Sequence, residues 1–215
     1  MAICAAAAAA AAALAVTATP VARAAAEPRH VRGPGELIVE IATINGSGCR
    51  ADTVFATVSE GDEAFTVTYS DYVARTGGSS KPLDARKNCL VVLKVHVPRS
   101  HTYAISSTDH RGHALLASGA KAIHRAGHSF QGHSDTWLIP HTLNGAYDGD
   151  WDFVDRTPDD QLVFKECGEE RNFNVLTELR VDKGASDPSK VSFITMATID
   201  NSLKTTYHLA WKRCP

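Results

Sequence analysis

The sequence lacks three features, and each absence argues against a class of protein. After the N-terminus, no segment reaches the roughly 20 consecutive apolar residues that a membrane-spanning helix needs. Lys and Arg number 22 against 24 Asp and Glu, so no basic excess of the kind that binds nucleic acid or anionic membranes is present. No C-x-x-C spacing occurs, which argues against a structural zinc site. We therefore expect neither nucleic acid nor a membrane as a partner.

The N-terminus carries the one strongly apolar block, MAICAAAAAAAAALAV (1–16). It is too short to span a membrane, and Ala24-Ala25-Ala26 has the small-x-small form that signal peptidase recognises. We predict that residues 1–26 are a signal peptide, with cleavage after Ala18 as the second choice. The mature protein is then secreted and extracellular, and it begins with a flexible arm over residues 27–35.

The cysteines predict a disulfide framework. Removal of the signal peptide leaves four of them: Cys49, Cys89, Cys167 and Cys214. An even number in an exported chain indicates two disulfides, and four cysteines allow three pairings. Cys89 begins a run in which every second residue is apolar, so it faces the core, and Cys49 is the nearest candidate partner in sequence. We favour sequential pairing, although crossed pairing stays open. Closing the loop between its two cysteines would let each bridge stabilise the fold by roughly 4 kcal/mol.

The mature chain reads as a succession of short β-strands. Segments rich in Val, Thr, Phe and Tyr alternate at period two and are separated by turns such as NGSG and RTGGSSKP. We assign residues 113–126 to one strand with a bulge at Ser118 and Gly119, in preference to a helix. Eleven strands are predicted in all: 37–44, 53–59, 64–73, 88–97, 101–106, 113–126, 135–143, 161–167, 172–181, 191–199 and 204–213.

This spacing favours an all-β fold. Many short strands with turn residues between them, and no linker rich in Pro, Gly or Ser, predict one antiparallel β-sandwich over residues 36–215. We expect a single domain of jelly-roll-like or Greek-key type, stapled by two disulfides.

Several stretches resemble a known family. They include INGSGC (44–49), RKNCLVVLKVHVP (86–98), ECGEERNFNVLTELRV (166–181) and IDNSLKTTYHLAWKRC (199–214). Together they are similar to the small secreted proteins of fungi and bacteria grouped as domain of unknown function 4360. The resemblance covers nearly the whole mature chain and includes all four cysteines. It implies export, a compact β fold and the two-disulfide framework, but no established activity. The family usually has an aromatic residue where this chain has His110.

An acidic stretch, YDGDWDFVD (147–155), raises the possibility of a metal site. Asp148, Asp150 and Asp152 alternate like the first ligands of a calcium loop, but Phe153 stands where an EF-hand needs glycine. A looser calcium site in a loop between strands is the hypothesis, and a solvated acidic loop is the alternative. No other cofactor is predicted.

Histidines and serines offer weaker signals. Six histidines lie close together in sequence: His110, His113, His124, His128, His133 and His141. Neither H-E-x-x-H nor H-x-H occurs, and His124 and His128 on one strand would lie about 13 Å apart, so we expect scattered surface histidines. GHSFQG (127–132) lacks the second glycine of a nucleophile elbow, which argues against a hydrolase based on Ser129.

Two tryptophans and one asparagine are candidate surface sites. Trp137 and Trp151 flank predicted loops and could form a stacking surface for sugars, whereas Trp211 alternates with core residues. Asn45-Gly46-Ser47 is a sequon for N-glycosylation, which matters only if the source is eukaryotic.

The sequence favours a recognition function over catalysis. We expect a monomeric, extracellular, non-enzymatic module that binds a cell wall, a polysaccharide or another protein. The alternatives are a secreted hydrolase and a host-directed effector or toxin. An exposed aromatic row with no buried polar cluster would support recognition, whereas a cleft with convergent carboxylates or histidines would support an enzyme.

Overall fold

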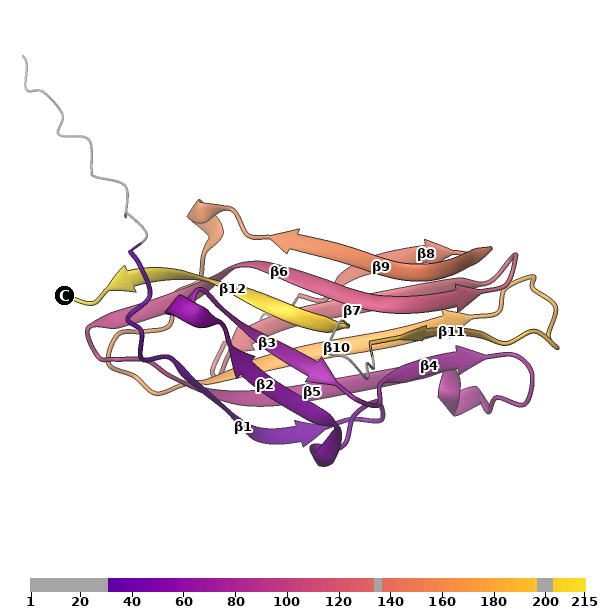
Figure 1. Ribbon diagram of the computed structural model, residues 1–215, viewed down its shortest axis with the longest axis horizontal. Coiled ribbons are helices and arrows are strands. Elements are labelled where there is room, and N and C mark those ends of the chain that lie inside the picture. The colour runs from indigo at the N-terminus through magenta and orange to yellow at the C-terminus, as the bar shows by residue number, and fades with distance from the viewer. Residues whose placement is uncertain (1–30, 134–136, 197–202) are drawn as a thin grey trace, which may run out of the picture.

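Two antiparallel β-sheets pack face to face in the computed structural model (Figure 1), which describes residues 31–133, 137–196 and 203–215. The first sheet has the strand order β1-β5-β10-β7-β8. The second has the order β2-β3-β12-β6-β11-β4, with β9 also paired to β6. The all-β, two-sheet antiparallel fold is thus confirmed.

The first sheet is built from five strands: β1 (Ile38–Asn45), β5 (Arg86–His96), β7 (Lys121–Phe130), β8 (Ile139–Asn144) and β10 (Asn172–Asp182). The second sheet contains seven strands: β2 (Val54–Val58), β3 (Ala64–Tyr69), β4 (Val73–Thr76), β6 (His101–Leu116), β9 (Tyr147–Arg156), β11 (Ser192–Thr195) and β12 (Lys204–Arg213). Four short 3-10 turns complete the described chain: η1 (Ala51–Thr53), η2 (Glu60–Asp62), η3 (Pro82–Ala85) and η4 (Asp159–Gln161).

The core lies between the two sheets and follows the predicted alternation. In β5, Cys89, Val91 and Leu93 are fully buried, whereas Lys94 faces solvent. Aromatic rings from both sheets fill the centre, and the Phe65 and Tyr207 rings stack at 5.0 Å between centroids. Aromatic side chains bury large apolar areas, so this cluster contributes much of the packing energy of the sandwich.

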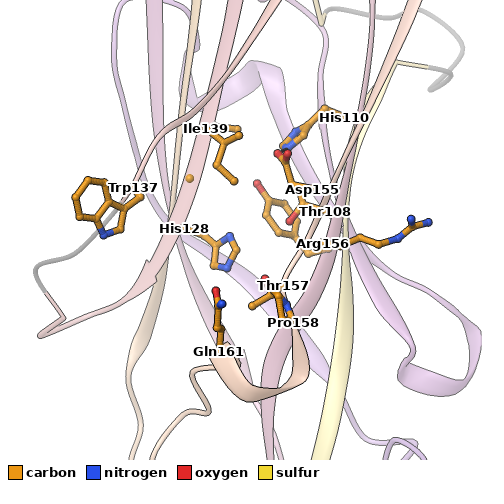
Figure 2. Close-up of a pocket in the computed structure, with 13 residues that line it drawn as sticks. Thr108, His110, His128, Trp137, Ile139, Asp155, Arg156, Thr157, Pro158 and Gln161 are labelled. Carbon is orange, nitrogen blue, oxygen red and sulfur yellow. Dashed lines mark ion pairs between the residues drawn. The ribbon is translucent and has the colours of Figure 1, made fainter.

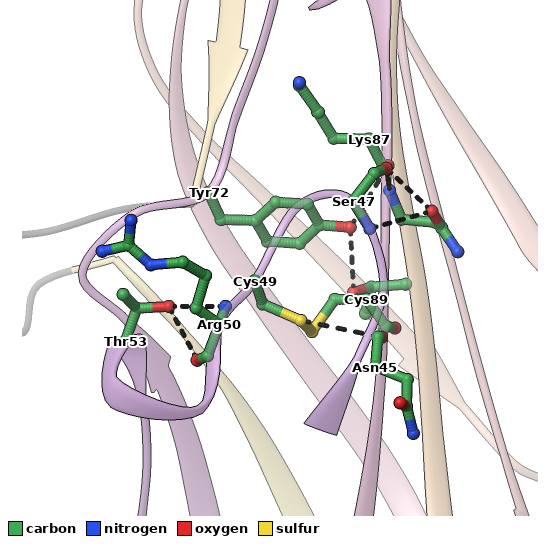
Figure 3. Close-up of a disulfide and its surroundings, with 10 residues drawn as sticks. Asn45, Ser47, Cys49, Arg50, Thr53, Tyr72, Lys87 and Cys89 are labelled. Carbon is green, nitrogen blue, oxygen red and sulfur yellow. Dashed lines mark hydrogen bonds between the residues drawn. A yellow bond between two sulfur atoms is a disulfide. The ribbon is translucent and has the colours of Figure 1, made fainter. Parts of the chain in front are cut away.

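Both disulfides join the predicted partners. Cys49 bonds to Cys89 and Cys167 to Cys214, over sequence separations of 40 and 47 residues. Figure 3 shows the first bridge beside the ring of Tyr72, where the turn after β1 meets β5. Gly48 permits this approach, because a Cβ there would lie 2.2 Å from the Tyr72 ring. The sequential pairing is confirmed.

Residues 113–126 form two strands and a turn, so the prediction of one bulged strand is wrong. β6 ends at Leu116 and β7 begins at Lys121. Gly119 has φ +87°, and the Ala120 amide donates to the Ala117 carbonyl at 3.0 Å. Glycine adopts this left-handed conformation without strain, so it allows a tight turn that carries the chain from β6 in one sheet to β7 in the other.

Two assignments in the second half of the chain are also wrong. Residues 161–167 form no strand, although the Lys165 amide donates to the Tyr103 carbonyl at 3.0 Å. The acidic stretch, predicted to be a loop, is instead strand β9. Its aspartates alternate with inward-facing Trp151, Phe153 and Asp155, so a period-two pattern was present but its polar half was unusually acidic.

The chain before β1 is partly anchored. The predicted signal peptide lies outside the described residues. Within the predicted arm, the Val31 amide donates to the Trp211 carbonyl at 3.1 Å, and Val31 packs against the core. The described part of this arm is therefore held on β12 rather than free. Within the described residues, the structure contains no helix with the length and apolar character to cross a membrane.

Candidate functional site

A groove opens between the two sheets beside strands β6, β7, β8 and β9. It consists of two adjoining hollows of about 310 Å³ and 360 Å³ that share His128, Thr157 and Gln161. Each hollow falls in the size range of small-molecule sites, roughly 300 to 1,000 Å³. We call this space the inter-sheet groove.

The lining of the inter-sheet groove combines apolar walls with inward polar groups. Ile139, at the start of β8, and Val163 are partly exposed along it. Figure 2 shows His128, Asp155 and Gln161 converging on the hollow from β7, β9 and η4. This combination of apolar surface and a few polar groups is typical of ligand-binding sites.

A cluster of histidines lies at the inner end of the groove. His110 from β6, His124 from β7 and His141 from β8 have ring centroids 4.6 to 6.5 Å apart. The Asp155 carboxylate on β9 lies 2.9 Å from His141 Nε2 and 3.4 Å from His110 Nε2. We call these four residues the histidine cluster. The expectation of scattered surface histidines is wrong for the three histidines of this cluster.

Strand pairing explains why this cluster forms. The turn at Gly119 carries the chain from β6 in one sheet to β7 in the facing sheet, and His124 on β7 pairs directly with His141 on β8 in register. His110 pairs with Phe153, two residues before Asp155. Even-numbered residues face inward along β7 and along β6 from Thr108 onward. That alternation was visible in the sequence, but it becomes informative only when the turn between the two sheets is recognised.

Burial governs the electrostatics of the imidazoles. His124 is fully buried, and neither ring nitrogen has a hydrogen-bond partner within the described residues. Burial lowers the pKa of His124 well below 6.5, and the neighbouring His110 and His141 lower it further. Burial also lowers the pKa of His128 to about 4. Both side chains are therefore neutral at neutral pH.

Asp155 is held ionised by its partners. Burial by itself would raise the pKa of this carboxyl, but hydrogen bonds from His110 and His141 outweigh burial and the pKa lies below its ordinary value. The Nδ1 atom of His110 lies 3.3 Å from Thr205 Oγ1, so both nitrogens of that ring are engaged. Asp155 consequently acts as an acceptor shared between β6 and β8.

The two candidate surface tryptophans differ. Trp137 is 82% exposed, and its indole projects away from the groove in Figure 2. Trp151 is only 3% exposed and packs against the His124 ring at 5.2 Å, so the prediction that it forms a binding surface is wrong. Gly112 makes room for it, because a Cβ there would lie 2.0 Å from the indole.

The three candidate calcium ligands lie on the exposed face of β9. Along a strand, residues on one face are about 7 Å apart, which separates Asp148, Asp150 and Asp152. Asp152 pairs with Arg111 at 3.0 Å, and Asp150 pairs with His113 at 2.8 Å. No set of three His, Cys, Asp or Glu residues within the described chain is arranged to hold a metal ion. The loop that the calcium hypothesis requires is a strand, and the geometry of the three aspartates does not support a shared ion.

The remaining candidates are positioned simply. Asn45 is exposed at the end of β1, and its glycosylation stays a prediction. Ser129 lies inside strand β7 rather than on a strand–turn–helix elbow. The sequence-based argument against a serine nucleophile at this position therefore stands.

Comparisons with known proteins give a family and a secreted relative. A relative of 25% identity over 181 residues, an uncharacterised secreted protein of Arthroderma benhamiae, covers 84% of this chain and 73% of its own length. Two solved structures are distant. The enzymatically active domain of bacteriophage CBA120 tailspike protein 4 has TM-score 0.26 and 10% identity, covering 80% of this chain and 19% of that one. A CBM4 structure has TM-score 0.20 and 13% identity, covering 85% and 89%. Scores this far below 0.5 do not establish a shared fold.

The family match covers nearly all of the described chain. Residues 36–214 match the family described as Domain of unknown function (DUF4360). The two disulfides and the secreted relative agree with an extracellular location, and the protein is secreted. The chain belongs to the DUF4360 family.

Proposed function

We propose that this secreted protein is a non-enzymatic recognition module that binds a polysaccharide chain in the inter-sheet groove. The observation that carries the proposal is the pairing of apolar walls, Ile139 and Val163, with inward groups at His128, Thr157 and Gln161. A pyranose ring has an apolar face and a rim of hydroxyl groups, so it requires both kinds of contact at once.

The shape and charge of the groove support an extended, uncharged ligand. Two hollows that share three residues form one elongated space, which suits several sugar units better than a single one. A neutral His128 offers one donor and one acceptor to hydroxyl groups. The Asp155 carboxylate already accepts hydrogen bonds from His110 and His141 within the histidine cluster.

The same residues argue against the hydrolase alternative. A glycosidase needs two carboxyl groups that flank the scissile bond. Among the described residues that line the groove, Asp155 is the single carboxylate. The convergent histidines are the observation in favour of an enzyme, but His110 uses both ring nitrogens and His124 does not line either hollow. Recognition is therefore the better-supported function.

Trp137 supplies a second contact surface beside the groove. The indole of Trp137 is 82% exposed, and aromatic faces stack on sugar rings. A polysaccharide in a cell wall presents many chains, so the groove and Trp137 can bind neighbouring strands.

The test measures binding of the mature protein to purified polysaccharides and intact cell walls. Gln161→Ala removes the hydrogen bond that we expect between the Gln161 amide and the ligand. Binding should weaken about ten-fold, since such a bond is worth about 1 kcal/mol or more. Trp137→Ala should weaken retention on cell walls. Phe55→Ala is the matched control, because Phe55 is 54% exposed but lies on β2, outside the residues that line the groove.

Three outcomes would contradict the proposal. Release of soluble sugar from the polysaccharide would favour the hydrolase. Binding confined to an extracellular protein or to host cells would favour the protein-binding or effector alternatives. Equal loss of affinity in Phe55→Ala and Gln161→Ala would remove the groove as the site.

A further inference from the structure

Strands β8 and β9 meet at the side of the sandwich where the groove opens. Within the described residues, β8 pairs only with β7 and β9 pairs only with β6, so each is an edge strand of its own sheet. Figure 1 shows them running side by side. No ladder of backbone hydrogen bonds joins them. Their polar contact is the bond between His141 Nε2 and Asp155 at 2.9 Å, and the Phe153 ring stacks on His141 at 4.4 Å.

The His124 ring packs against both His141 and Phe153, and its full burial disfavours a positive charge on it. The titratable groups that face it are His110 from β6 and His141 from β8, and the Asp155 carboxylate on β9 contacts both of these rings. The remaining neighbours are apolar or aromatic: Trp151 and Phe153 from β9, and Leu179 at the paired position of β10. One carboxylate can neutralise only one protonated imidazole among three.

We propose that the histidine cluster is an acid-sensitive latch that holds β8 against β9 at neutral pH and releases them on acidification, which opens the groove. The closed arrangement keeps the His124 ring neutral, and within the described residues neither ring nitrogen has a hydrogen-bond partner. When the edge opens, water solvates the ring and its ordinary affinity for a proton returns. Solvent protons therefore bind the open form preferentially and shift the equilibrium toward it.

The latch connects directly to the groove. His110 and Asp155 belong to the histidine cluster and also line the first hollow, and Ile139 lies two residues from His141 on the same short strand. Displacement of β8 moves one wall of the hollow. The effect on ligand release rests on the proposed function, whereas the opening itself does not.

Amide hydrogen exchange of the mature protein tests the opening without any ligand. We compare residues 139–156, which contain β8 and β9, with residues 86–96 of β5, after correction for the intrinsic pH dependence of exchange. Acidification from about pH 7.5 to about pH 4.5 crosses the range in which ordinary imidazoles titrate. Opening linked to one proton should increase exchange in β8 and β9 by about ten-fold per pH unit, with little change in β5.

Three variants decide the origin of the effect. His124→Phe should abolish the pH dependence, because the ring is replaced by one that cannot bind a proton. His208→Asn is the matched control and should behave as wild type, since His208 pairs with Asp109 at 2.9 Å on a partly exposed surface. His128→Gln should also keep the effect, because His128 lies in the groove but not in the latch. If His124→Phe fails to fold, a nuclear magnetic resonance titration of the His124 ring signals in the wild-type protein provides the test instead.

The outcomes separate the latch from the binding function. Wild-type exchange that does not rise in β8 and β9, a His124→Phe protein that keeps the full dependence, or a His124 ring that titrates like an exposed imidazole would each overturn the latch. Acid-dependent exchange without binding to any polysaccharide at neutral pH would support the latch and contradict the proposed function. Binding that stays constant while the edge opens would contradict only the release step.

Discussion

The region around the first disulfide and the region around the histidine cluster close the same sandwich by opposite means. Near the turn after β1, the disulfide between Cys49 and Cys89 joins this turn to β5, and Cys89 is fully buried among apolar side chains. At the β8 and β9 edge, three imidazoles and one carboxylate join the sheets. The first closure contains no titratable side chain in its bridge, whereas the second, in the latch proposed above, opens when His124 binds a proton.

This difference separates the stable part of the molecule from the part that can respond. Burial of apolar side chains and a closed disulfide loop raise the free energy of unfolding without offering chemistry to a ligand. Buried polar groups stabilise much less, and one such as His124, which has no hydrogen-bond partner in the described part of the chain, costs stability. Such a cost is a reason to look for function at the histidine cluster rather than at the disulfides.

The largest expected effect sharpens the comparison within the disulfides themselves. Replacement of both Cys49 and Cys89 by Ala should cost about 4 kcal/mol from loop closure, plus the loss of packing at a buried site. The double Ala variant of Cys167 and Cys214 is the matched control, because its loop is nearly the same length but Cys167 is exposed. Denaturant unfolding should rank the first variant below the second. Equal losses would show that burial at Cys89 adds nothing.

The next effect contrasts the two tryptophans. Trp151→Ala should destabilise the protein by about 3 to 5 kcal/mol, because it empties a packed site against His124. Trp137→Ala should change the free energy of unfolding by no more than about 0.5 kcal/mol, since its indole is exposed. Thermal and denaturant melts measure both. A large loss for Trp137→Ala would mean that its side chain supports the fold rather than a ligand.

Acid should weaken the histidine-lined region selectively. The pKa of His128 is about 4 in the folded protein and about 6.5 when unfolded, so the unfolded chain binds more protons between these values. The free energy of unfolding should therefore fall as the pH drops from about 6.5 to about 4. The upper bound for this residue is about 3 kcal/mol, and the expected loss is smaller because the residue is partly exposed. His124, also with a lowered pKa, acts in the same direction.

Unfolding at a series of pH values measures this slope. The His128→Gln and His124→Phe variants should each flatten it, whereas His208→Asn should not. A contribution from Asp155 runs over a lower range, because a lowered carboxyl pKa loses its stabilising effect only when the pH falls through that value. A wild-type protein equally stable at pH values of about 7 and about 4.5 would contradict the burial of both rings.

Sequence periodicity was sufficient for the apolar region. Alternation in β5 gave the inward phase of Cys89, and the even count of cysteines in an exported chain gave two bridges. Those signals are local or combinatorial, so no knowledge of strand pairing was needed. The sequential pairing was one of three, and it became certain only with the structure.

The histidine cluster could not be read in the same way. His110, His124, His141 and Asp155 meet through two strand pairings, one in each sheet, and through the packing of the two sheets, and a one-residue change of register would turn any of them to the other face. Strand β9 was hidden because charged residues on its exposed face resembled a solvated loop. The assignment of residues 113–126 to one strand also missed the turn at Gly119, which carries the chain from one sheet to the other and brings His124 toward His110.

The smallest expected effect concerns the exposed face of β9 and completes the contrast with its buried face. Asp148, Asp150 and Asp152 alternate along an extended strand, and all three already contact a basic side chain, either His113 or Arg111. Calcium binding at 100 times its dissociation constant would stabilise the protein by about 2.7 kcal/mol. We instead expect the same melting temperature in calcium and in chelator, because an extended strand cannot wrap several carboxylates around one ion. Conversion of all three residues to Asn should leave the acid dependence intact, since Asp155 faces the opposite side of the strand. A calcium-dependent rise in melting temperature that these substitutions abolish would restore the calcium site and place a second function on β9.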